Sequence, residues 1–286
     1  MRILHFSAAY SLILLLVSVS VRAAEEAYPA VAPNVSFDAV FALPYRDSDH
    51  RISYGPDPLQ FGQLWLPQGK NQGDSRGLLV FIHGGCWLNE YGIDHAQAVS
   101  AALAAEGYGV WALEYRRTGD PGGGWPGSFE DVIAGINHVS ELARYGVDSE
   151  RVALLGHSAG GHLAVLAGAR EELLTVQPDL VVGLAAITDV VSYARGGNSC
   201  EQATPAFMGG SPEQRTEAYS EANPVSHGVH PATILLQGNV DQIVALSQAS
   251  LPAAETRLSE GAGHFDWVHP GTSAFQDLLQ ILAGEW

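Results

Sequence analysis

Short, continuous runs of apolar residues recur along the chain, and segments with helical spacing of apolar residues lie between them. A continuous apolar run of about four to eight residues is typical of a strand that is buried on both faces of a parallel sheet. The runs that fit this description cover residues 78–82, 110–114, 151–155, 180–187 and 233–237. Helical spacing is found in residues 96–106, 131–145, 163–170 and 272–282. This alternation predicts an α/β protein with a mostly parallel central sheet and helices on both faces.

Less regular segments precede, interrupt and follow this pattern. Residues 37–43 and 59–66 are predicted to form the first strands, and residues 255–258 the last one. Residues 190–223 have weak periodicity and are expected to cover the carboxyl edge of the sheet as a short cap segment. Because no repeat, low-complexity segment or linker divides the chain, a single domain is expected.

The N-terminus has the three parts of a secretory signal peptide. Arg2 provides a positive charge, residues 8–21 are mostly apolar, and Val21-Arg22-Ala23 places small residues where signal peptidase cuts. The apolar segment is short for a bilayer span, and acidic residues follow it. We therefore expect a signal peptide over residues 1–23, a mature catalytic domain over residues 24–286, and export to the periplasm or the medium without a retained membrane anchor.

The composition narrows the range of partners. The formal net charge is -17, and the sequence pI is about 4.9. A surface with this charge repels nucleic-acid backbones and anionic membranes. Hydrophobic residues make up 47% of the 286 residues, which is enough for a large buried core. The chain is therefore expected to be globular, with neither nucleic acid nor a membrane surface as its partner.

A serine stands between a predicted strand and a predicted helix. The sequence Gly156-His157-Ser158-Ala159-Gly160 has the G-x-S-x-G pattern of a nucleophile elbow. The serine of such an elbow adopts strained backbone angles that lift its hydroxyl above the sheet, so the flanking glycine positions have no room for a Cβ atom. The helix that follows directs its positive dipole end toward the reacting group. Ser158 is therefore the predicted nucleophile.

A serine hydroxyl needs a base to accept its proton and a carboxylate to orient that base. The chain order for this type of elbow is Ser, then Asp or Glu, then His. Asp241 follows the predicted strand 233–237 in a glycine-containing turn, and His264 follows the last predicted strand, directly after Gly263. Asp241 and His264 are therefore the predicted acid and base.

Other residues compete for both roles. Asp189 also ends a predicted strand, but one strand earlier than the acid usually stands, and its alternative role is to cap the segment that begins at Val190. The competing histidines are His269, which precedes Pro270, His227 and His230, which lie in a polar loop, and His157 and His162, which are too close to Ser158 along the chain to face it. His269 is set aside because the Pro270 after it indicates the lead-in to a helix, so Asp241 and His264 remain the predicted acid and base.

Backbone amides are suitable donors to an oxyanion because they cannot be titrated away. His83-Gly84-Gly85 follows the predicted strand 78–82 and has the form of an HGGG-type loop. The glycines of such a loop leave room for a carbonyl oxygen to approach the amides. The predicted oxyanion hole therefore consists of the amides of Gly84 and Gly85 and the helix-start amide of Ala159.

Two cysteines, Cys86 and Cys200, remain in a chain that is expected to be exported. An even number of cysteines in an oxidising compartment favours a disulfide. Cys86 follows the predicted oxyanion loop and Cys200 lies in the predicted cap segment, so the two can meet; two buried thiols are the alternative. The cysteines lack zinc-binding spacing, and the glycine-rich segments lack the Lys-Ser/Thr of a phosphate loop. No metal and no cofactor are therefore expected.

Four motifs together resemble the α/β-hydrolase superfamily. They are His83-Gly84-Gly85-Cys86-Trp87, Gly156-His157-Ser158-Ala159-Gly160-Gly161, the turn that contains Asp241, and Gly263-His264-Phe265-Asp266. Within the superfamily they are similar to the branch of hormone-sensitive-lipase-type esterases and kynurenine formamidases. This resemblance covers the chain from residue 59 to the C-terminus. It implies the α/β-hydrolase fold, a carboxylic ester or arylformamide substrate, a Ser-Asp-His triad and no metal.

The expected function is that of a serine hydrolase that cleaves small carboxylic esters through an acyl-enzyme. The alternative is an arylformamidase or amidase of kynurenine-formamidase type. Export of the chain, and a cysteine where many relatives carry a third glycine or a polar residue in the loop, favour the esterase. A non-catalytic binding protein on the same scaffold is the third possibility, which the presence of Ser158, Asp241 and His264 disfavours.

Overall fold

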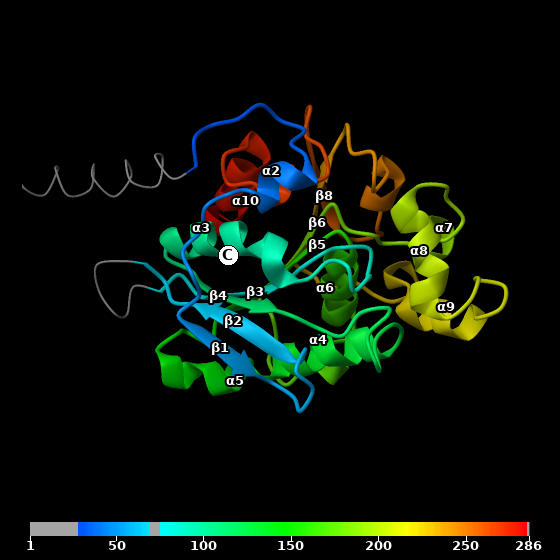
Figure 1. Ribbon diagram of the computed structural model, residues 1–286, viewed down its shortest axis with the longest axis horizontal. Coiled ribbons are helices and arrows are strands. Elements are labelled where there is room, and N and C mark those ends of the chain that lie inside the picture. The colour runs from blue at the N-terminus through cyan, green and yellow to red at the C-terminus, as the bar shows by residue number, and fades with distance from the viewer. Residues whose placement is uncertain (1–27, 69–74, 285) are drawn as a thin grey trace, which may run out of the picture.

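A sheet lies at the centre of the molecule, between the helices (Figure 1). It has eight strands in the order β1-β2-β4-β3-β5-β6-β7-β8. The computed structural model describes residues 28–68, 75–284 and 286. The strands are β1 (His50–Ser53), β2 (Phe61–Trp65), β3 (Leu78–Ile82), β4 (Gly109–Leu113), β5 (Val152–His157), β6 (Leu180–Leu184), β7 (Thr233–Gly238) and β8 (Glu255–Ser259). β2 pairs antiparallel with β1 and β4, and all pairs from β4 to β8 are parallel. The prediction of a mostly parallel sheet is confirmed.

Helices cover both faces of the sheet (Figure 1). Alternate side chains of a central strand enter different cores, so that Leu79 and Phe81 of β3 face one core and Val80 faces the other. The helices on the Leu79 face are α3 (Gln97–Ala105) and α10 (Ser273–Gly284), and those on the Val80 face are α4 (Gly127–Asn137), α5 (Val139–Leu142) and α6 (Ala159–Ala169). Because both faces are covered, the central strands are apolar throughout, which explains the continuous runs in the sequence.

Three further helices lie between β6 and β7, within the predicted cap segment of residues 190–223. They are α7 (Val190–Tyr193), α8 (Ser199–Met208) and α9 (Thr216–Ala222). The stacked rings of Trp87 and Phe207, whose centroids are 4.7 Å apart, join α8 to the loop after β3. A 2.7 Å hydrogen bond between His162 Nε2 and the carbonyl oxygen of Ala222 joins α6 to the end of α9. The segment therefore packs on α6 and on the loop that follows β3.

The N-terminal part of the structure departs from the prediction. Residues 37–43, predicted as a strand, instead contain the short helix α2 (Phe37–Phe41). The side chain of Ser36 caps this helix by accepting a hydrogen bond from the backbone of its first turn. Val40 is the one residue of α2 that is buried, so the segment has no buried strand face. The prediction also missed β1, because Ile52 alone is buried in that strand and no apolar pattern results.

The remaining described segments are short or irregular. The amides of Asn34 and Val35 donate to the carboxylate of Asp266, at 2.6 and 2.8 Å, and tie the start of the described chain to the region after β8. The short 3-10 helices are η1 (Ile93–Ala96), η2 (Ala143–Tyr145), η3 (Glu171–Leu173), η4 (Pro224–Ser226), η5 (Leu246–Ala249) and η6 (Asp266–Val268). The predicted signal peptide, residues 1–23, lies outside the described residues. Across residues 28–68 and 75–284, no helix has the length and apolar composition needed to cross a membrane.

Six histidines of the described residues are buried, and His95, His157 and His162 are three of them. Burial lowers the pKa of His162 to about 4, although the hydrogen bond to Ala222 acts in the opposite direction. Burial and the neighbouring His83 lower the pKa of His95 to about 3. His95 and His162 therefore stay neutral in the folded protein at pH 5, but each takes up a proton when the chain unfolds, since an ordinary imidazole has a pKa of about 6.5.

We predict that the free energy of unfolding falls as the pH is lowered from about 7 to about 5, and that His162→Gln makes this fall smaller. His162 binds a proton near pH 6.5 when unfolded and near pH 4 when folded, so its contribution is complete above pH 6.5 and is lost as the pH falls toward 4. In the variant, the slope of the unfolding free energy against pH should decrease by up to about 1.4 kcal/mol per pH unit. Urea denaturation at several pH values measures this slope. An equal slope in both proteins would show that His162 titrates alike in the two states.

Candidate active site

Ser158 occupies the turn between β5 and α6, and its backbone is strained. Its φ of 57° and ψ of -119° lie in a region that residues with a Cβ atom rarely adopt. The amide of Ser158 donates to the carbonyl oxygen of Leu184 at 2.8 Å, which anchors the turn to the end of β6. The residue is 2% exposed. The turn thus has the strained backbone that the G-x-S-x-G pattern requires.

Close packing of the backbone explains the small residues around this turn. A Cβ atom on Gly160 would overlap the carbonyl oxygens of Ile82 and His83, at the end of β3. A Cβ atom on Gly84 would lie 3.0 Å from the Cβ atom of Ser158. The loop after β3 therefore lies directly against the serine and the start of α6.

Three backbone amides near Ser158 can serve as hydrogen-bond donors. The amides of Gly84, Gly85 and Ala159 have no acceptor within the described part of the chain. Ala159 is the first residue of α6, and the first amides of a helix have no partner inside the helix. Gly85 has a φ of 112°, a conformation that favours glycine, so the loop can turn at this point. These amides are therefore able to donate to an oxygen atom of a bound substrate.

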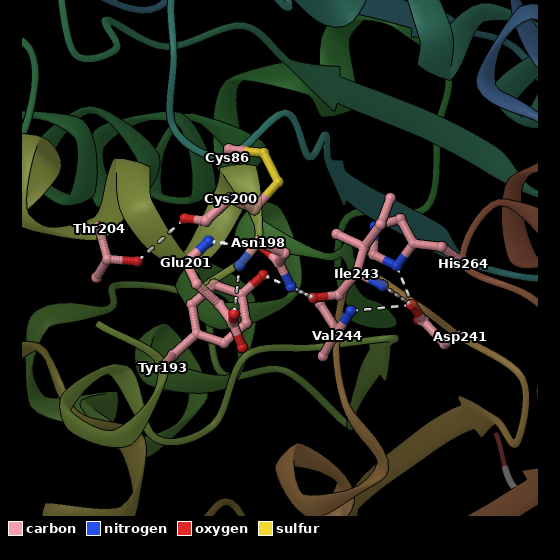
Figure 2. The surroundings of a disulfide bond; sticks show 10 residues. All are labelled: Cys86, Tyr193, Asn198, Cys200, Glu201, Thr204, Asp241, Ile243, Val244 and His264. Carbon is pink, nitrogen blue, oxygen red and sulfur yellow. Dashed lines mark hydrogen bonds and ion pairs between the residues drawn. A yellow bond between two sulfur atoms is a disulfide. The ribbon is translucent and has the colours of Figure 1, made fainter. Parts of the chain in front are cut away.

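His264 and Asp241 form a buried, hydrogen-bonded pair (Figure 2). Nδ1 of His264 lies 2.8 Å from Oδ2 of Asp241, which also accepts from Gln237 Nε2 at 3.1 Å. Oδ1 of Asp241 accepts from the amides of Ile243 and Val244, at 2.8 and 2.9 Å. Burial alone would raise the pKa of Asp241, but the interactions with His264 and the two amides lower it below its ordinary value. Because a carboxylate can only accept, Nδ1 carries the proton and Nε2 is the basic nitrogen of His264.

The competing residues have partners elsewhere. Asp189 is the N-cap of α7, and its carboxylate accepts from the amides of Val191 and Ser192, each at 3.1 Å. Nδ1 of His269 accepts from the amide of Gly271 at 3.1 Å. The other competing histidines contact acceptor groups of their own: His227 contacts the carbonyl of Glu221, His230 the carboxylate of Glu171, and His162 the carbonyl of Ala222. Of the acid and base candidates that the sequence offers, the structure thus brings Asp241 and His264 together.

A buried ion pair supports the loop after β3, and sequence reasoning missed it. Nε2 of His83 lies 2.9 Å from Oε1 of Glu114, and Nη1 of Arg117 lies 3.3 Å from the same oxygen. The hydroxyl of Tyr115 donates to the carbonyl oxygen of His83 at 2.9 Å. Burial alone would raise the pKa of Glu114, but His83 and Arg117 lower it below its ordinary value, so the carboxylate stays charged. The available signal was a charged residue, Glu114, at the end of an apolar run.

His157 also supports the site in a way that the sequence did not indicate. Its Nε2 donates to the carbonyl oxygen of His264 at 2.9 Å, and the two ring centroids are 4.7 Å apart. Burial, reinforced by His264 and His95, lowers the pKa of His157 well below its ordinary value, so the ring is neutral. Sequence reasoning set His157 aside because it stands next to Ser158. The structure places it against the backbone of the proposed base instead.

The two cysteines form a disulfide bond. Cys86 and Cys200 are 114 residues apart in sequence, and their Cα atoms are 5.0 Å apart (Figure 2). The bond joins the loop after β3 to α8. Within the described ranges, no group of three or more His, Cys, Asp or Glu residues is arranged to hold a metal ion.

The sequence is similar to a known family and to curated esterases. A family model described as BD-FAE matches residues 63–255, more than half of the chain. Esterase LipC of Mycobacterium tuberculosis (strain ATCC 25618 / H37Rv) is 28% identical over 225 residues, which are 73% of this chain and 55% of LipC. Probable isoprenylcysteine alpha-carbonyl methylesterase ICMEL1 of Arabidopsis thaliana is 32% identical over 114 residues, which are 40% of this chain and 23% of that protein. The chain thus spans about half of the length of LipC and less of ICMEL1.

Solved structures resemble the fold over almost its whole length. Esterase B from Lactobacillus Rhamnosis (HN001) superposes with a TM-score of 0.72 at 21% identity, covering 95% of this chain and 93% of that one. A truncated form of a carbohydrate esterase from gut microbiota gives a TM-score of 0.69 at 20% identity, covering 84% of this chain and 96% of that one. At such identities the likeness establishes the fold alone. It confirms the α/β-hydrolase fold that the motifs imply.

Proposed function

The chain belongs to the BD-FAE family, and from this premise we propose that it is a serine hydrolase that cleaves small carboxylic esters. The observation that carries the proposal is the 2.8 Å hydrogen bond between Nδ1 of His264 and Asp241. The two residues follow the parallel strands β8 and β7, so they lie at the edge of the sheet where Ser158 follows β5. The esterase names of LipC and ICMEL1 support an ester substrate.

In the proposed acylation step, Nε2 of His264 takes the hydroxyl proton of Ser158 while Oγ attacks the ester carbonyl carbon. The electron pair of the carbonyl bond moves onto its oxygen, and the amides of Gly84, Gly85 and Ala159 donate to this oxyanion. When the intermediate collapses, the bond to the alcohol oxygen breaks and that oxygen takes the proton from His264. An alcohol leaves, and an acyl group remains on Ser158.

Deacylation repeats these steps with water as the nucleophile. His264 takes a proton from water, the hydroxide attacks the acyl carbonyl, and the released Oγ of Ser158 takes the proton back. Asp241 holds the imidazole in the tautomer with the proton on Nδ1 and stabilises the imidazolium that forms in each step. The low pKa of Asp241 supports this role, because the carboxylate remains charged throughout. The mechanism needs no cofactor.

We further propose that residues 1–23 are a signal peptide and that the mature domain, residues 24–286, works in the periplasm or outside the cell. The disulfide between Cys86 and Cys200 supports export, because disulfides persist in oxidising compartments. The net charge of -17 supports a small-molecule substrate rather than nucleic acid or an anionic membrane.

We predict that Ser158→Ala lowers kcat for short p-nitrophenyl esters by about 10³-fold or more, because it removes the nucleophile. The variant should unfold at the wild-type temperature, since the only group lost is one hydroxyl. A folded variant that keeps a tenth of the ester activity would refute the mechanism.

We also predict that the wild-type protein hydrolyses p-nitrophenyl esters faster than N-formylkynurenine. Parallel rate measurements on the two substrates test this preference, and the reverse order would assign a formamidase.

We predict that His264→Gln abolishes ester turnover, whereas His269→Gln retains most of it. A general base works only in its unprotonated form, so kcat/KM of the wild-type protein should be higher at neutral than at acidic pH. His269→Gln is the matched control, because it changes a buried histidine five residues further on and should keep this pH profile. Steady-state rates between about pH 5 and about pH 9 give both results. An inactive His269→Gln beside an active His264→Gln would mean that the base has been misassigned.

A further inference from the structure

The carbonyl oxygen of Ile243 accepts hydrogen bonds from two side chains of the cap segment (Figure 2). Nδ2 of Asn198 donates to it at 2.9 Å, and the hydroxyl of Tyr193 donates at 3.0 Å. Ile243 lies two residues after Asp241, the proposed acid of the triad. The cap segment therefore holds the loop that carries the acid, whereas the carboxylate itself is hydrogen-bonded by Gln237, Ile243, Val244 and His264.

The peptide unit between Ile243 and Val244 connects these donors to the carboxylate. This bond is trans, and the C=O and N–H groups of a planar trans peptide point in opposite directions. The C=O of the unit accepts from Asn198 and Tyr193, while its N–H, the amide of Val244, donates to Oδ1 of Asp241 at 2.9 Å. Holding the carbonyl therefore sets the direction of the amide. A carbonyl that accepts hydrogen bonds also polarises its own peptide unit and strengthens the amide as a donor.

Both donors are themselves held at helix ends. Asn198 is the N-cap of α8, where its Oδ1 accepts from the amide of Glu201 at 2.9 Å and the Glu201 carboxylate accepts from the amide of Asn198 at 2.8 Å. This capping box leaves Nδ2 of Asn198 to donate to Ile243. Tyr193 is the last residue of α7, is 2% exposed, and packs its ring edge-on to Trp87 with the centroids 6.4 Å apart. These contacts hold the side chains of Asn198 and Tyr193 in place independently of their hydrogen bonds to Ile243.

The start of α8 is also bonded to the loop that presents the proposed oxyanion amides. Cys200 lies two residues after Asn198 and forms the disulfide with Cys86, the residue that follows Gly85 (Figure 2). Residues 198–200 thus touch two loops at once, one by a hydrogen bond to Ile243 and the other by a covalent bond.

We propose that Asn198 is a positioning residue for ester hydrolysis, which keeps Asp241 aligned with His264 through the carbonyl of Ile243. Tyr193 is the second donor to this carbonyl, and the start of α8 braces the acid loop and the oxyanion loop against each other. The inference rests on the proposed function, because it assigns to Asp241 the task of orienting the base.

Two substitutions remove the donors while keeping the surrounding packing. Asn198→Ser retains a side chain that caps α8 well and fits the capping box with Glu201, but it is too short to reach Ile243. Tyr193→Phe keeps the ring and loses the hydroxyl, and the double variant leaves the Ile243 carbonyl without a side-chain donor. Thr204→Val is the matched control, because it removes a buried hydroxyl of α8 that donates to the carbonyl oxygen of Cys200 and has no bond to Asn198, Ile243 or Asp241.

We expect kcat for p-nitrophenyl esters to fall about 3- to 10-fold in each single variant and about 10- to 100-fold in the double variant, with KM unchanged. The downfield proton resonance of His264 Nδ1–H should shift or broaden in the same order, because it reports the bond to Asp241 directly. Thr204→Val should leave both kcat and this resonance unchanged. If the double variant does not fold, the single variants provide the same comparison.

Wild-type kcat in a folded variant that lacks the donors would overturn the proposal. An equal loss of kcat in Thr204→Val would do the same, because the loss would then follow any change in α8 and not the hydrogen bond to Ile243. Should Ser158→Ala retain ester turnover, the proposed function would fail on its own. The His264 resonance would still show in that case whether Asn198 positions Asp241.

Discussion

The close approach of the loop after β3 to the start of α6 is the constraint on which the rest of the site depends. Gly160 packs so tightly against the carbonyl groups at the end of β3 that no Cβ atom fits. The same approach brings Gly84 against Ser158, where its amide and that of Gly85 can serve a substrate oxygen. This is possible because β3 and β5 are adjacent parallel strands, with Ile82 opposite Gly156. The order of strands in the sheet therefore determines the shape of the site.

Pairs of buried polar groups hold the loops of the site in position. A charge inside a protein is tolerated when it is paired and hydrogen-bonded, and removing one partner leaves the other uncompensated. Glu114 meets this condition through His83, beneath the loop after β3. Asp241 meets it through His264 and two backbone amides, beyond the carboxyl ends of the last two strands. Each pair connects segments that are distant in sequence and thereby ties the loops of the site to one another.

Features with a strong local signal could be predicted from the sequence, and those that depend on distant partners could not. The buried strands were readable because both of their faces are apolar, and the turn at Ser158 was readable because its neighbouring glycines leave a fixed pattern. Residues 37–43 were misassigned, since six apolar residues among seven outweighed the capping signal of Ser36. Glu114 was passed over because its partner His83 lies 31 residues away. Asn198 was passed over for the same reason, because its partner Ile243 is 45 residues away and the intervening segment has no clear period.

Covalent labelling tests most directly the claim that Ser158 is an activated nucleophile. A p-nitrophenyl alkylphosphonate reacts with such a serine, releases p-nitrophenol and leaves a phosphonyl ester on Oγ. Intact-mass measurement and peptide mapping should find one phosphonyl group per chain, on Ser158, and none in Ser158→Ala. Labelling of a different residue in the folded wild-type protein, or no labelling of a preparation that hydrolyses esters, would contradict the role assigned to Ser158.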